Sequence, residues 1–380
     1  MSAPATRPLP RQLEILQVYR GVASLLVVLY HLTWWGGGAS YLQLPSWTPG
    51  LPPDKPAGLF RFGHSGVDFF FTLSGFVMVW GYGAHAGDVR RLGRFLWSRF
   101  TRIYPTYWAI LALTLAYLWT HHGVNDTALG SDALVRGVLL VGMGPWQIPP
   151  SGTLPFELAL YVFFALVFLL GWSPFVMAAL LWCSLIAGAE LRFLHLAPHP
   201  ILLSTSMLEF FLGCLGAAII QRFRPRLSGW WLVAAILLCA AIGVFDSVES
   251  ALDRHHNIRN FAIPYFLLIV TGVGFELRRA RRYPRLLMLI GDASYSIYLS
   301  HFYLIWEING WAYRRGLSAR IGLDGQKTVV LIAVVTLGVV VWALIERPLL
   351  RWSGRRGVRV DLPAPSVTAQ VPDEIRKATV

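Results

Sequence analysis

The sequence predicts an all-α polytopic membrane protein with about ten transmembrane helices plus one short re-entrant or interfacial segment. Of its 380 residues, 55% are hydrophobic and only 14% are charged, whereas soluble domains carry about 25% charged residues. The mean hydropathy is +0.53. Apolar runs long enough to cross a bilayer recur along the chain, and basic residues concentrate in the short loops between them. Membrane spans therefore account for most of the length.

Ten apolar runs of about 17 residues or more are candidate spans. They cover residues 13–35, 66–83, 103–120, 154–172, 174–190, 203–221, 230–245, 260–277, 286–306 and 328–346. An eleventh run, 134–143, is too short to cross the bilayer unaided, so we expect it to be re-entrant or interfacial. The spans give one integral membrane domain, 1–346. A cytoplasmic tail, 347–380, follows and is expected to be largely disordered from about residue 361.

The net charge of +13 would suggest a nucleic-acid partner in a soluble protein. Here arginines cluster in loops 88–102, 221–226 and 278–285 and after residue 346, which is the positive-inside pattern of cytoplasmic segments. We therefore expect membrane lipids as partners and no nucleic acid. Loops 88–102 and 221–226 share one side only if an even number of crossings separates them, which requires that 134–143 does not cross. Both termini are then cytoplasmic.

Cysteine placement gives no sign of metal or disulfide chemistry. Cys183, Cys214 and Cys239 all lie inside apolar runs, and no Cys/His pattern has the spacing of a metal site. We expect neither a disulfide nor a bound metal.

The first span contains two ionisable residues in the stretch "YRGVASLLVVLYHLTWW". Arg20 and His31 are eleven residues apart, which at about 100° per residue places them on one helix face about 16 Å apart. An ionisable group inside a bilayer costs about 2–3 kcal/mol and is a site hypothesis by default. The alternatives are a snorkelling anchor for Arg20 and a packing role between helices for His31.

Three further spans carry ionisable groups at the expected depth of His31. Asp68 begins the second span, Glu157 lies with Tyr161 at the start of another, and His301 lies in the outer part of the ninth. A single buried polar residue is usually a packing residue, but four at one level favour a polar cavity. We therefore expect His31, Asp68, Glu157 and His301 to converge.

Arg99 and Arg102 lie on the side expected to be cytoplasmic. They are three residues apart, so on a helical turn both point the same way. Paired guanidinium groups suit phosphate oxygens; the alternative is ordinary positive-inside charge. Arginines inside and a histidine within the membrane suggest a phosphorylated donor with a long arm, such as coenzyme A. An imidazole beside a thioester can act as a general base or be acylated itself.

These motifs resemble the membrane-bound acyltransferase-3 family, in particular its exopolysaccharide O-acetyltransferase branch. The matching motifs, in chain order, are Arg20-x10-His31, "GVDFFFTLSGF" after the first outer loop, Arg99-x-x-Arg102-Ile103-x-Pro105, "GDASYSIYLSH" ending at His301, and "ERP" at 346–348. One departure concerns the Trp-Thr-Leu-x-x-Glu motif of the branch. Here "GTLPFE" places Gly152 where the tryptophan would be and Pro155 inside the motif, on the side that faces the acceptor.

The resemblance implies an acyl-CoA-dependent O-acyltransferase of the bacterial inner membrane. It would move an acyl group, with acetyl-CoA as the expected donor, from the cytoplasm to a hydroxyl of an extracytoplasmic or lipid-linked polysaccharide. The resemblance also implies that His31 is catalytic and that Arg99 and Arg102 bind the donor. Beyond the resemblance, we expect Arg20 to help position the donor and Glu157 or Asp68 to orient or polarise His31. The candidates for substrate binding are Tyr161, Tyr295 and His301.

Three other interpretations remain open at this stage. The acceptor could be a small molecule, such as a macrolide or a lipid. The buried histidines and carboxylates could instead relay protons in a sugar or lipid transporter. A non-catalytic assembly partner of a polysaccharide synthase is the third, although it leaves the shared face of Arg20 and His31 without a purpose. The sequence carries no signal for an oligomeric state.

The crossing count makes a topology prediction. A reporter fused after Gln221 should read as cytoplasmic, because four crossings separate that position from the basic loop 88–102. The measurement is the activity of a reporter that works on only one side of the membrane, and a periplasmic signal would contradict the ten-span topology.

Overall fold

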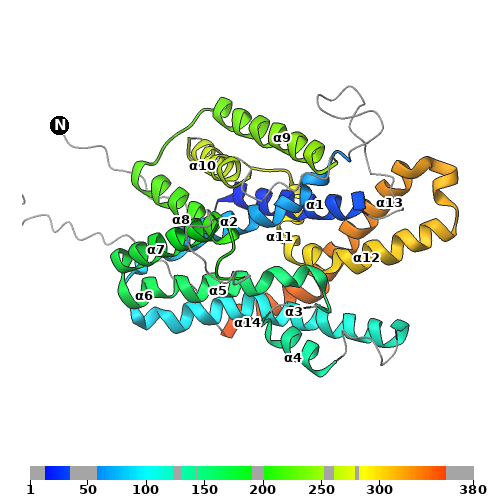
Figure 1. The fold of residues 1–380 in the computed structure, drawn as a ribbon, viewed down its shortest axis with the longest axis horizontal. Helices are drawn as coiled ribbons and strands as arrows, with labels where there is room; N and C mark the ends of the chain where they lie inside the picture. The colour runs from blue at the N-terminus through cyan, green and yellow to red at the C-terminus, as the bar shows by residue number, and fades with distance from the viewer. Residues whose placement is uncertain are drawn as a thin grey trace, which may run out of the picture.

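The fold is known from a computed structural model that describes residues 13–34, 58–122, 130–142, 144, 146–190, 201–251, 261–278 and 282–356. Its elements are all helices (Figure 1), as the composition predicts. In this view α1 and α2 lie in the middle, with α9 and α10 on one side and α3 and α5 on the other. The disorder expected from residue 361 falls outside the described residues.

The helices follow one another with short breaks. The α-helices are α1 (Glu14–Trp34), α2 (Gly66–Tyr82), α3 (Leu92–His122), α4 (Ser131–Leu139), α5 (Leu154–Phe164), α6 (Leu166–Leu170), α7 (Trp172–Glu190), α8 (Ser206–Phe223), α9 (Gly229–Ala251), α10 (Ala262–Arg278), α11 (Arg285–Asp292), α12 (Ser294–Arg314), α13 (Leu317–Val341) and α14 (Arg347–Arg356). Short 3-10 helices are η1 (Arg61–Ser65), η2 (Gly83–His85), η3 (Val89–Arg91) and η5 (Pro149–Thr153), and η7 (Trp342–Glu346) is a π-helix.

Within the described part of the chain, seven helical stretches are long and apolar enough to cross a membrane. They contain α1, α2, α5 with α6, α7, α8, α9 and α13. Helices also occupy the other three expected spans, as α3, α10 and α11 with α12, but these are either shorter or less apolar than the seven. The structure thus confirms a polytopic helical protein, and the count of ten crossings stays a prediction.

Two boundaries differ from those expected. The basic loop 88–102 is largely helical, because α3 begins at Leu92 and runs without interruption past Pro105. The expected span 286–306 is instead two helices that meet at Ala293, and the second continues to Arg314. An apolar run in the sequence identifies only the apolar part of a helix. Polar turns at either end of the same helix therefore lie outside the predicted span.

The short segment 134–143 falls mostly in α4, which has nine residues and is about 13 Å long. Aromatic side chains of α3 satisfy its C-terminal carbonyls: Tyr107 donates to Gly137 at 2.7 Å and Trp108 to Val138 at 2.9 Å. These donors replace the partners that a helix end otherwise finds in water. The helix is therefore too short to span the bilayer, as expected.

Helix α1 is the centre of the assembly, since it contacts α2, α10, α11 and α12. The carboxylate of Glu276 on α10 accepts hydrogen bonds from the first amides of α1, at Glu14 (3.0 Å) and Ile15 (2.9 Å). A carboxylate in this place satisfies unpaired amides and complements the helix dipole. Tyr19 donates to the Leu268 carbonyl at 3.0 Å. These contacts fix the register of α1 against α10.

Helices α2 and α8 pack at unusually short range. A Cβ added at Gly75 would lie 1.9 Å from the Phe210 carbonyl oxygen, and one added at Gly213 would lie 1.9 Å from that of Thr72. The absence of side chains at both glycines lets the backbones touch, as small residues do between membrane helices. This contact holds α2, which lines the candidate site.

Gly75→Ala should therefore destabilise the protein by about 1–3 kcal/mol, the usual cost of overpacking. Gly81 of the same helix has no atom within 4 Å of an added Cβ, so Gly81→Ala is the matched control and should leave stability equal or slightly higher. The measurement is the thermal midpoint of both variants in detergent. Equal midpoints would show that the close approach does not limit packing.

Candidate active site

A cavity of about 580 Å³ lies among the helices that carry the predicted site residues. Its wall is built by α1, α2, α3, α5, α11 and α12. Six of the nine predicted site residues line it: Arg20, Arg99, Arg102, Glu157, Tyr161 and Tyr295. It extends from Leu13 and Glu14 at the start of α1, which is the cytoplasmic end in the predicted topology. The cavity therefore joins three arginines to the side where a soluble anionic donor would arrive.

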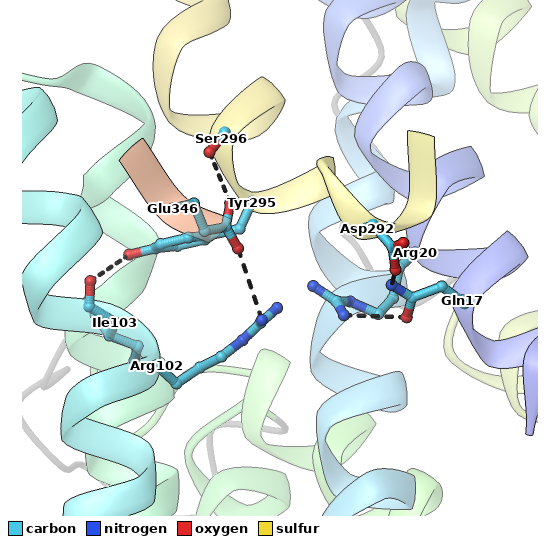
Figure 2. A network of polar contacts seen from close by, with 8 residues as sticks. All are labelled: Gln17, Arg20, Arg102, Ile103, Asp292, Tyr295, Ser296 and Glu346. Carbon is cyan, nitrogen blue, oxygen red and sulfur yellow. Dashed lines mark hydrogen bonds and ion pairs between the residues drawn. The ribbon is translucent and has the colours of Figure 1, made fainter. Parts of the chain in front are cut away.

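Arg20 lines this cavity, and a series of hydrogen bonds that begins on α11 holds its side chain. A Cβ at Gly291 would lie 2.1 Å from the Gln17 carbonyl oxygen, so the glycine lets α11 approach α1. Asp292 accepts a hydrogen bond from Gln17 Nε2 at 2.5 Å, and Gln17 Oε1 accepts one from Arg20 Nη1 at 3.2 Å (Figure 2). The side chain of Arg20 is thus directed by protein groups.

Arg102 approaches the same space from α3 (Figure 2). Its Nη1 lies 3.7 Å from Oε1 of Glu346, a residue with no exposed surface. The other oxygen of Glu346 accepts a hydrogen bond from Ser296 Oγ at 2.6 Å. The ring of Tyr295 lies 5.8 Å from the Arg102 guanidinium carbon, and its hydroxyl donates to the Ile103 carbonyl at 3.1 Å. Tyr295 therefore supports Arg102.

Arg99 lies among aromatic rings. Its guanidinium carbon is 5.2 Å from the centre of the Tyr82 ring, 5.9 Å from Phe95 and 5.6 Å from Tyr161, distances typical of cation–π contacts. One Nη donates to the Tyr82 hydroxyl at 2.9 Å, while Nε is buried and has no hydrogen-bond acceptor among the described residues. The aromatic rings thus hold the Arg99 guanidinium, and its Nε–H remains available as a hydrogen-bond donor.

Glu157 and Tyr161 face this cationic group from α5. Tyr161 donates a hydrogen bond to Oε1 of Glu157, as expected for residues one helical turn apart. Both line the cavity beside the arginines, and no hydrogen bond or ion pair in the described structure joins Glu157 to His31. The expected contact between Glu157 and the histidine is therefore absent.

His31 instead contacts His301. The Nδ1 of His31 lies 2.9 Å from the Val27 carbonyl oxygen and 3.3 Å from Nε2 of His301, while Nδ1 of His301 lies 2.6 Å from the Tyr298 carbonyl oxygen. Carbonyl oxygens only accept, so both Nδ1 atoms carry the hydrogen when the rings are neutral. The Nε2 of His301 then accepts from His31. This arrangement leaves the lone pair of His31 Nε2 available as a base.

Tyr298 lies between the cavity and this histidine pair. It lines the cavity, and its ring centre is 5.9 Å from that of His301. Its hydroxyl lies 2.9 Å from Thr153 Oγ1 and donates to the Pro150 carbonyl at 2.9 Å. The inner end of the cavity is therefore one helical turn from His301, which in turn touches His31.

Asp68 belongs to a different group, so the expectation that four ionisable residues converge is wrong for this one. It is 3% exposed on α2, and its carboxylate interacts electrostatically with Glu209 of α8, which is 1% exposed. It does not line the cavity, and no hydrogen bond or ion pair in the described structure joins it to His31. Asp68 therefore lies among two other buried acids, Glu209 of α8 and Asp246 of α9.

Several site residues escaped the sequence analysis. They are Gln17, Tyr82, Asp292, Ser296, Tyr298 and Glu346. Asp292 and Glu346 belong to the "GD" and "ERP" motifs, which therefore held the signal. At Gly152, where the acyltransferase-3 branch usually has tryptophan, an added Cβ would lie 2.9 Å from Nε1 of Trp146. An indole from the preceding loop thus stands next to this position.

The chain is similar to known acyltransferases. A family model described as "Acyltransferase domain" matches residues 13–346. The chain is 28% identical to the "Exopolysaccharide production protein ExoZ" of Rhizobium meliloti, over 81% of this chain and 96% of the relative. It is 28% identical to the "Acyltransferase MdmB" of Streptomyces mycarofaciens, over 83% and 87%. It is 34% identical to "Protein 2 in picA locus" of Rhizobium radiobacter, over 38% and 72%.

No solved structure gives a significant match. The family model nevertheless covers the whole cavity and both histidines, and it ends at the buried glutamate that pairs with Arg102. The chain therefore belongs to the acyltransferase-3 family of membrane acyltransferases.

Proposed function

We propose that this acyltransferase moves an acetyl group from cytoplasmic acetyl-CoA to a hydroxyl of an extracytoplasmic or lipid-linked polysaccharide. The observation that carries the proposal is the cavity itself. Three arginines line it, and its inner end is one helical turn from a histidine pair. The localisation that fits this reaction is the bacterial inner membrane with both termini cytoplasmic.

The donor end of the cavity suits a phosphorylated molecule. Of the three cavity arginines, only Arg102 has an ion pair to a carboxylate in the described structure. Guanidinium groups bind phosphate oxygens well. The Leu73, Val77 and Met78 side chains add apolar wall. The axial distance of about 16 Å between Arg20 and His31 is comparable with the reach of a pantetheine arm.

His31 is the proposed general base. Its Nε2 takes the proton of the acceptor hydroxyl as that oxygen attacks the thioester carbonyl carbon. The carbon–sulfur bond then breaks, and the imidazolium returns the proton to the departing thiolate. The Val27 carbonyl, 2.9 Å from Nδ1, holds the required tautomer, and His301 Nε2 shares the same hydrogen at 3.3 Å. This replaces the orientation by Glu157 or Asp68 that the sequence suggested.

The acceptor is proposed by analogy. A relative that aligns over nearly its whole length is named an exopolysaccharide production protein, which supports a polysaccharide. In the predicted topology His31 lies in the outer part of α1, where an extracytoplasmic acceptor would enter, and it contacts His301 there. Mass spectrometry of acetylated products in the polysaccharide, lipid and small-molecule fractions separates these acceptor classes.

Acetyl-CoA should raise the thermal midpoint of the detergent-purified protein in a saturable way, because a ligand that binds only the folded state stabilises it by mass action. In the double variant Arg99→Ala/Arg102→Ala, at least ten times more acetyl-CoA should be needed to reach the same rise in thermal midpoint. Arg222→Ala, an arginine of α8 outside the cavity, is the control. The absence of a shift at millimolar acetyl-CoA, in protein shown to be folded, would contradict the donor and favour a transporter.

His31→Ala should lower acetyl transfer by about 10²–10⁴-fold, the usual contribution of a general base. It should leave acetyl-CoA binding largely intact, because the phosphates would contact the cavity arginines and not His31. The measurement is transfer of radiolabelled acetyl groups to polysaccharide in host membranes. His85→Ala is the control, because this buried histidine pairs with Arg91 away from the cavity. Normal transfer by folded His31→Ala would exclude His31 as the base.

A further inference from the structure

We infer that Glu346 is a positioning residue that holds Arg102 in the productive orientation for the donor phosphates. The inference rests on the proposed acyl-CoA donor and adds a residue that does not itself touch the cavity. It comes from a buried carboxylate that links three helical segments far apart in the sequence.

The complete burial of the Glu346 carboxylate calls for a physical explanation. It has no exposed surface although it ends a hydrophobic helix, and Leu344 two residues earlier is 72% exposed. A carboxylate inside a membrane protein is costly unless it is paired. It closes the π-helix Trp342–Glu346, and single π-turns often mark functional positions. The chain thus keeps a buried acid at the end of a π-helical turn.

The two carboxylate oxygens of Glu346 have different partners. Oε2 accepts from Ser296 Oγ at 2.6 Å, which fixes the carboxylate on α12. Oε1 lies 3.7 Å from Arg102 Nη1 and has no hydrogen bond. The ion pair is therefore longer than a hydrogen bond. It attracts the Arg102 guanidinium toward Glu346, but it does not use the N–H groups of the guanidinium as hydrogen-bond donors.

The junction of α11 and α12, whose Ser296 binds Glu346, also orients Arg20. Asp292 and Ser296 are four residues apart on either side of the break at Ala293. Asp292 directs Arg20 through Gln17, and Ser296 directs Arg102 through Glu346. The two guanidinium groups then face each other from α1 and α3 (Figure 2). A dianionic phosphate group between them would contact both.

Glu346 could act in two opposite ways. If it only neutralised Arg102, its removal would strengthen anion binding. If it positions Arg102, removal lets a long, flexible side chain turn away from Arg20, because like charges repel and arginine extends toward water. The second effect should dominate, since Ser296 keeps the carboxylate fixed and the 3.7 Å pair is too long for a hydrogen bond, so the N–H groups of the oriented Arg102 remain for the phosphate.

The test is the dissociation constant of acetyl-CoA for the full chain in detergent. Glu346→Gln should weaken binding roughly tenfold, the scale of losing a residue that orients a binding group. Binding of S-acetylpantetheine, which lacks the phosphate groups that Arg102 would contact, should not change. In an Arg102→Ala background, Glu346→Gln should add nothing, because coupled residues are non-additive. Glu209→Gln, an equally buried acid outside the cavity, should leave both constants unchanged.

Tighter or unchanged acetyl-CoA binding by Glu346→Gln would overturn the inference, and so would an undiminished effect in the Arg102→Ala background. If Glu346→Gln fails to fold, Ser296→Ala releases the same carboxylate and should weaken acetyl-CoA binding in the same direction; unchanged binding would again overturn the inference. Failure of the parent protein to bind acetyl-CoA would overturn the proposed donor, and this inference with it. If Arg102→Ala weakens acetyl-CoA binding and Glu346→Gln does not, the proposed donor is supported and only the positioning role of Glu346 is overturned.

Discussion

The high free-energy cost of an unpaired charge inside a membrane is the constraint on which the rest of this structure depends. Several buried ionisable groups find a partner on another helix, so polar contacts help to decide how the helices meet. Glu276 joins α10 to the start of α1. Asp292 reaches Arg20 through Gln17, and Glu346 joins the end of α13 to α3 and α12. The same contacts that stabilise the helix arrangement therefore build the cavity.

This constraint also explains why the site has two parts. The arginines occupy a cavity that begins at the cytoplasmic end of α1 in the predicted topology, where guanidinium groups can remain hydrated until an anion binds. The histidines lie deeper and satisfy each other and two backbone carbonyls. Tyr298 connects the two parts, since it lines the cavity and contacts His301. One helix, α1, carries a member of each part, so its register sets the spacing between Arg20 and His31.

Close backbone approach is what lets these partners reach one another. Gly291 brings α11 against α1 at Gln17, and Gly75 brings α2 against α8. Neither glycine lies in a turn; both serve helix contact. The second contact has a consequence for Asp68, which it directs toward Glu209 and away from His31. Packing between two helices thus moved an expected site residue out of the site.

The sequence by itself determined whatever depends on local periodicity. Hydrophobicity set the helical membrane class, the spacing of Arg20 and His31 placed both on one face, and Arg99 with Arg102 had to point the same way. Only the tertiary structure decided which helix each face meets. Glu157 lies with the arginines, His301 replaces a carboxylate beside His31, and Glu346 pairs with Arg102. The physical reason is that sequence pattern fixes a residue's depth and its face, whereas the rotation and neighbours of each helix follow from long-range packing.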